Sequence, residues 1–166
     1  MNQPPRRIEQ PNQNSRDRQS NVRGENRQQQ PDIAQEIVNT IKGLKTPKEE
    51  EGSLKYYPIR ILVEQAQVFG PELKRQRLET NQVRKFLDAI NQLKAKLVGN
   101  DFSVIETEVV LLKPKLAYAA ARQDAVKSLS RVMSTAIDKV HSKEDFERLV
   151  QLMESIIAYH KAEGGK

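Results

Sequence analysis

Apolar residues recur at intervals of three and four along most of this chain, the period of helices that bury one face. The first stripe follows Asp32, a suitable N-cap with Gln35 as its capping-box partner. A second helix is predicted to start near Pro58 and stop at Gly70, and Thr80 is predicted to cap a third. The inward-facing residues predicted for these helices are Ile33, Ile37, Ile41 and Leu44, then Ile59, Leu62, Val63, Ala66 and Phe69, then Val83, Phe86, Ile90, Leu93 and Leu97.

The same period continues through the second half of the chain. It predicts a helix over about residues 103–122, another over about 124–141, and a last one capped by Ser142 with Asp145 three positions later. A Gly-Gly pair at 164–165 is predicted to end this last helix. The inward-facing residues of the last two are Leu129, Val132, Met133, Ala136 and Val140, then Phe146, Leu149, Val150, Met153, Ile157 and His160.

No segment alternates convincingly between apolar and polar residues, so the fold class predicted is all-α. Residues 32–166 are expected to form a single helical-bundle domain of about five to six helices, with short connections that place neighbours antiparallel. Residues 1–31 offer almost nothing to bury and are rich in Gln, Asn, Pro and Arg, so a disordered tail is predicted. This tail carries six arginines against three acidic residues, which fits either an arm that touches RNA or a solubilising extension.

Composition narrows the function classes. The chain has no cysteine, which excludes disulfides and thiolate chemistry and favours an intracellular, cytoplasmic protein. The start has no apolar run behind its arginines, so no secretory signal is expected, and no apolar run of membrane-spanning length is present. His141 and His160 are too far apart for a metal pair on one helical turn, and no phosphate-binding glycine loop occurs. We therefore expect no cofactor and no enzyme.

Positive charge is unevenly distributed. The net charge is +6, from 28 basic and 22 acidic residues. Residues 74–97 contain seven basic residues against Glu79 and Asp88, whereas residues 32–166 as a whole have 22 against 19. One region thus concentrates cations, as a protein that binds a phosphate backbone requires, although a solvated helix surface fits the same count.

The stretch "LLKPKLAYAAARQ", residues 111–123, places a proline inside a helical pattern. Pro114 is predicted to kink or restart the helix, because proline removes one helical hydrogen bond. Beyond it, Lys115, Tyr118 and Arg122 form a narrow stripe at helical spacing, suited to phosphates and to a base or ribose. The alternative is that Tyr118 packs at a helix crossing.

Three segments together resemble a known family. "NQVRKFLDAINQLK", "LLKPKLAYAAARQ" and "FERLVQLMESIIAYHKAEGGK" are similar in order and spacing to the signature regions of the small helical subunit of the type III-A CRISPR effector, the second Csm protein. The resemblance covers about residues 62–166. It implies a compact helical bundle without nuclease activity, whose copies stack into a filament and help to hold the crRNA and the target single-stranded RNA, mainly by the sugar-phosphate backbone.

The resemblance also implies candidate residues and partners. The partners are crRNA, target RNA, other subunits of the Csm complex and copies of the chain itself. The alternative function is a structural helical adaptor that acts only through protein contacts. The RNA-contacting candidates are Arg84, Lys85, Lys113, Lys115, Tyr118, Arg122 and Lys161, and the candidates for assembly or packing are Tyr159 and His160.

Overall fold

The computed structural model describes residues 31–47 and 52–164, and this part of the chain is helical and contains no strand. The all-α class predicted from the sequence is confirmed; apart from Pro31, the predicted tail lies outside the described residues. If α4 and α5 are counted as two parts of the helix expected over 103–122, six helices remain, within the expected number. The helices are α1 (Ile33–Lys42), α2 (Ile59–Arg75), α3 (Thr80–Leu97), α4 (Glu106–Val110), α5 (Leu112–Arg122), α6 (Lys127–Ile137) and α7 (Lys143–Ala162), and 3₁₀ turns span Leu54–Tyr56, Phe102–Val104 and Asp124–Val126.

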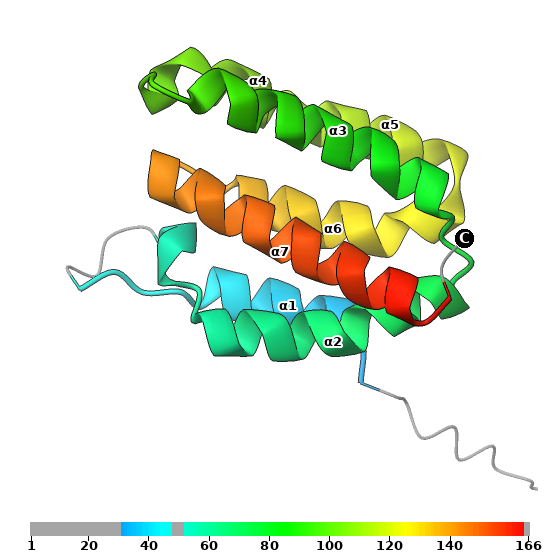
Figure 1. Ribbon diagram of the computed structural model, residues 1–166. Coiled ribbons are helices and arrows are strands. Elements are labelled where there is room, and N and C mark those ends of the chain that lie inside the picture. Colours follow the sequence, from blue (N-terminus) through cyan, green and yellow to red (C-terminus); the bar gives the residue numbers. More distant parts are fainter. Residues whose placement is uncertain (1–30, 48–51, 165–166) are drawn as a thin grey trace, which may run out of the picture. The chain divides into compact units, whose positions relative to one another are not determined.

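The helices of this unit lie in three layers (Figure 1). α1 and α2 form one outer layer, α6 and α7 the middle layer, and α3 with α4 and α5 the other outer layer. α7 contacts α2, α3 and α6 and so lies at the centre of the packing. Its buried residues occur on more than one side of the helix, as expected for a helix covered from both layers.

Two of the three predicted N-caps are confirmed and one is wrong. The Asp32 carboxylate accepts a hydrogen bond from the Gln35 amide at 3.3 Å, and the Ser142 hydroxyl accepts one from the Asp145 amide at 3.2 Å. Thr80 is instead the first residue of α3, and Glu79 is its cap. Glu79 forms a capping box with Gln82, whose side chain accepts from the Glu79 amide at 3.3 Å.

The predicted end of α2 at Gly70 is also wrong. The helix continues through Gly70 and Pro71 to Arg75. It ends in a Schellman motif, in which Arg77 has the left-handed φ of 63° and the Leu78 amide donates to the Leu73 carbonyl at 3.0 Å. An arginine therefore occupies the position where glycine is usual.

The core consists largely of the residues that the period selected. Ile59 is an exception, because its side chain is 46% exposed and the buried face of α2 begins only at Leu62. Tyr57, in the connection before α2, is instead completely buried. Its hydroxyl donates to the Gln65 side-chain oxygen, and burial raises its pKa above the ordinary value.

Candidate nucleic-acid interface

The helix predicted over 103–122 breaks and restarts just before the Lys-Pro-Lys sequence. α4 ends at Val110, α5 begins at Leu112, and Pro114 is the third residue of α5. The amides of the first helical turn have no partner within their helix, so the missing proline N–H costs little there. The restart sets the direction of α5 and of the side chains that it carries.

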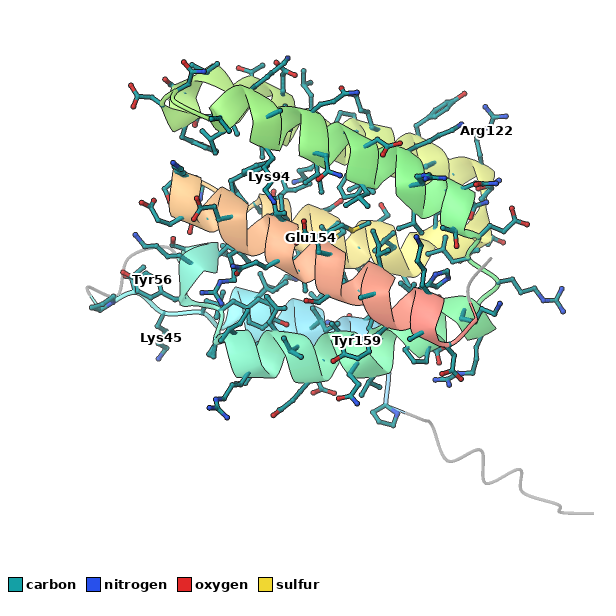
Figure 2. All side chains as sticks on the ribbon, in the orientation of Figure 1. Lys45, Tyr56, Lys94, Arg122, Glu154 and Tyr159 are labelled. Carbon is teal, nitrogen blue, oxygen red and sulfur yellow. The ribbon has the colours of Figure 1, made fainter. Side chains whose placement is uncertain are left out.

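Lys115, Tyr118 and Arg122 lie on the exposed side of α5. Tyr118 is 65% exposed, so it does not pack at a helix crossing. Arg122 Nη1 donates to the Tyr118 hydroxyl at 3.0 Å, and the guanidinium carbon lies 5.6 Å from the centre of the tyrosine ring. Figure 2 shows Arg122 at the outer edge of the layer that α3 and α5 form. The pair is thus ordered by a hydrogen bond and a cation–π contact while it stays accessible.

A groove of about 550 Å³ runs between α3 and α5, and residues next to these helices complete its lining. We call it the α3–α5 groove. Its floor is apolar and is built by buried side chains, whereas its rim carries exposed cations from both helices. The floor includes Phe86, Leu112, Leu116, Ala119, Val126 and Leu129, and the rim includes Lys85, Lys115, Tyr118 and Arg122. α3 therefore adds Lys85 to the stripe of α5.

The charges of the rim cations are not paired with acidic side chains in the part of the chain that the structure describes. Within residues 31–47 and 52–164, Lys85, Lys115 and Arg122 form no ion pair with a carboxylate. Glu79 also lines the groove, but its carboxylate accepts a hydrogen bond from the backbone N–H of Gln82 in the capping box. The rim consequently keeps a net positive charge that an anionic ligand can neutralise.

Other cations of the basic segment are paired with carboxylates, one from the same helix and two from other helices. Arg75 pairs with Glu72 at 2.7 Å and Lys96 with Glu108 at 2.7 Å. Lys94 of α3 and Glu154 of α7 lie 3.6 Å apart, between the two helices, as Figure 2 shows. The net positive charge around residues 74–97 in the folded protein is therefore smaller than a count over this segment alone gives.

The structure does not bring all candidate RNA contacts into the groove. Lys113 forms an ion pair with Asp138 at the end of α6. Arg84 is exposed on α3, next to Lys85, but does not line the groove, and Lys161 is exposed near the end of α7. Four candidates meet at the groove and three lie elsewhere.

The two packing candidates lie where α7 meets α2 and the connection to α3. The His160 ring is buried, and its Nε2 is 2.8 Å from the Leu78 carbonyl oxygen. Since a carbonyl only accepts, Nε2 carries the proton and donates. Tyr159 is half-buried beside Gly70. Leu78 itself lines the α3–α5 groove, so the hydrogen bond from His160 helps to hold a residue of the groove lining in place.

Three amide side chains at the groove were not singled out from the sequence. Asn81, Gln82 and Gln123 line it, and Gln82 donates from its Nε2 to the Gln123 side-chain oxygen. Amide side chains are common on helix surfaces, so their occurrence in the sequence indicates no site. Gln82 lies in α3, whereas Gln123 follows the end of α5. Only the fold places these groups together.

The described residues offer neither a grouped set of metal ligands nor a membrane-spanning helix. Among them, no group of three or more His, Cys, Asp or Glu side chains is arranged to hold a metal ion. None of the helices in this part of the chain has the length and apolar character needed to cross a membrane.

The fold and the groove define a small helical protein with a cationic groove rim. The family model Csm2 Type III-A matches residues 56–166, so the chain belongs to this family, as the resemblance indicated. A relative from Streptococcus thermophilus, named CRISPR system Cms protein Csm2, is 31% identical over 91 residues, which are 54% of this chain and 75% of the relative. No solved structure matches. The chain is thus a subunit of a type III-A CRISPR complex, and its partners are other Csm subunits.

Proposed function

We propose that this chain is a non-catalytic small subunit that holds crRNA and target RNA by the sugar-phosphate backbone, in the cytoplasm. The observation that carries the proposal is the rim of the α3–α5 groove, where Lys85, Lys115 and Arg122 gather without a carboxylate partner among residues 31–47 and 52–164. Cations of this kind release the counterions of a nucleic acid when they bind its phosphates. Such contacts are independent of sequence, which suits a complex that must accept any guide.

Two side chains that could serve acid–base chemistry, His160 and Glu154, are engaged in the fold. His160 is buried and donates to the Leu78 carbonyl, and Glu154 pairs with Lys94 on the neighbouring helix. His160 and Glu154 do not line the α3–α5 groove, so neither is placed to act as a base on a ligand bound there. These engagements support a non-catalytic subunit.

Copies of the chain are proposed to stack within the complex. Exposed apolar side chains in the segment that joins α3 to α5 support this part of the proposal, because a neighbouring copy can cover them. They are Val98, Val104, Val110 and Leu111, each at least 50% exposed.

Fluorescence anisotropy of a labelled single-stranded RNA tests the RNA-binding proposal. The full chain is titrated at several salt concentrations, and an RNA duplex of the same length serves as the comparison. We expect binding that is indifferent to base sequence and that weakens with salt by a slope of ~0.7 per phosphate contact. An absence of binding even at the lowest salt would contradict the proposal.

A further inference from the structure

The α3–α5 groove has a property that phosphate contacts alone do not require. Its floor is made of buried apolar side chains, among them Phe86, Leu116 and Leu129, each at most 8% exposed. Phosphates need only cations and polar donors. A ligand that fills this groove must therefore bring an apolar surface as well as negative charge.

The groove has room for a compact group that brings such an apolar surface. Its volume of about 550 Å³ lies within the range of sites that enclose small ligands. Lys85 stands on the α3 side of the floor, and Lys115 and Arg122 stand on the α5 side. A planar group on the floor would thus be flanked by cations from two helices.

Polar groups of a particular kind line the same space. The side chains of Asn81, Gln82 and Gln123 each have both hydrogen-bond donors and acceptors. At the rim, Tyr118 presents an exposed ring beside the Arg122 guanidinium. The Gln82 amide is engaged at both ends, because it accepts from the Glu79 N–H and donates to the Gln123 oxygen. Within the part of the chain that the structure describes, the Asn81 amide and the Gln123 Nε2 make no side-chain hydrogen bond and can pair with the edge of a base. Rings and guanidinium planes stack with bases regardless of their identity.

We infer that the α3–α5 groove accepts one unstacked nucleobase of a bound single-stranded RNA, while Lys85, Lys115 and Arg122 hold the phosphates on either side. The inference rests on the proposed RNA-binding function and adds a base to the backbone contacts. An acidic peptide would also match the charge of the rim. The amide groups and the exposed Tyr118 ring favour a base, because both match its edge and its face.

The decisive comparison is between two ligands of equal charge. One is an oligouridylate of about 12 nucleotides, and the other is the same ribose-phosphate chain without bases. We expect the full chain to bind the abasic oligomer about tenfold more weakly, with the same salt slope, since the phosphate contacts are kept. Equal affinities would overturn the base inference and leave the backbone proposal standing, whereas no binding of either oligomer would overturn both.

A variant that fills the groove provides a second test. Ala119→Phe adds a ring to the floor without changing the charge, and Ala117→Phe adds the same ring on an exposed position of α5 that does not line the groove. We expect Ala119→Phe to weaken binding of oligouridylate to the level of the abasic oligomer, and Ala117→Phe to leave it unchanged. Unchanged RNA binding by a folded Ala119→Phe protein would overturn the inference and point to a protein ligand in the groove.

Discussion

The backbones of α2 and α7 touch where Gly70 meets His160. A Cβ atom on Gly70 would lie 2.5 Å from the His160 amide nitrogen and 2.8 Å from the Tyr159 carbonyl carbon. Gly70 is inside α2, so its role is this close approach and not the end of the helix. The contact also holds His160 in position to donate to Leu78 at the end of the α3–α5 groove.

Gly70→Ala is expected to destabilise the protein by about 2–3 kcal/mol, because the added methyl group meets backbone atoms that cannot rotate away. Urea unfolding followed by circular dichroism measures the change. Gly43→Ala is the control, since its Cβ would meet no atom closer than 3.2 Å and its φ of −82° suits any residue. If both variants unfold at the same urea concentration, the close contact does not exist.

Arg77→Gly is expected to stabilise the protein by about 0.5–1 kcal/mol, because glycine adopts the left-handed φ of 63° without strain. Arg77→Ala removes the same charge but keeps a Cβ atom, so the difference between the two variants isolates the backbone effect. Thermal unfolding of both proteins provides the measurement. A glycine variant no more stable than the alanine variant would refute the assigned conformation.

Asp145 joins the segment before α2 to the start of α7. Its buried carboxylate accepts hydrogen bonds from the Ser53 hydroxyl, from the Lys55 amide at 2.8 Å and from the His141 amide at 3.0 Å. Burial alone would raise the pKa of Asp145, but these hydrogen bonds outweigh it and hold the pKa below its ordinary value of 3.8. The ionised form therefore stabilises the fold.

Asp145→Asn is expected to cost about 2–3 kcal/mol near neutral pH, because the amide cannot accept every one of these hydrogen bonds. Because the pKa of Asp145 is lowered in the folded state, its contribution to the free energy of unfolding depends on pH. The contribution of Asp145 is present above pH 3.8 and is lost as the pH falls through the lower pKa of the folded state, since the unfolded chain binds the proton first.

Urea unfolding of the wild type and Asp145→Asn over this range measures the difference, with Glu147→Gln as an exposed control on α7. The stability gap between the wild type and Asp145→Asn should narrow on acidification. A gap that stays constant down to strongly acidic pH would show that the ionised carboxylate is not the stabilising group.

The helical period and the capping residues were enough to predict the core and two helix starts. They failed at the end of α2, where Gly70 was predicted to end the helix, although the helix continues to Arg75 and the left-handed residue after it is Arg77. The reason is physical: the need for a glycine at position 70 comes from α7, which is distant in the sequence. Local composition contains no information about that contact.

In the candidate site too, some features follow from the local sequence and others depend on contacts between distant segments. The stripe of Lys115, Tyr118 and Arg122 follows from helical spacing within one segment. The groove itself needs α3 beside α5, and the charge balance of the basic segment depends on Glu108 and Glu154 from other helices. Which cations remain uncompensated could therefore not be predicted before the fold was known.

The rim of the α3–α5 groove is proposed to bind RNA phosphates, and one pair of double variants distinguishes this rim from positive charge elsewhere on the protein. Lys115→Ala with Arg122→Ala removes two rim cations, and Lys42→Ala with Arg60→Ala removes two exposed cations from α1 and α2. The net charge falls equally in both proteins. The affinity of each for a single-stranded RNA is measured by anisotropy as a function of salt.

We predict that the rim variant binds more weakly and that its salt slope falls by about 1.4, the value for two lost phosphate contacts on a single strand. The control variant should keep the slope of the wild type. Equal slopes for the rim variant and the control would show that net charge, and not the groove, determines binding.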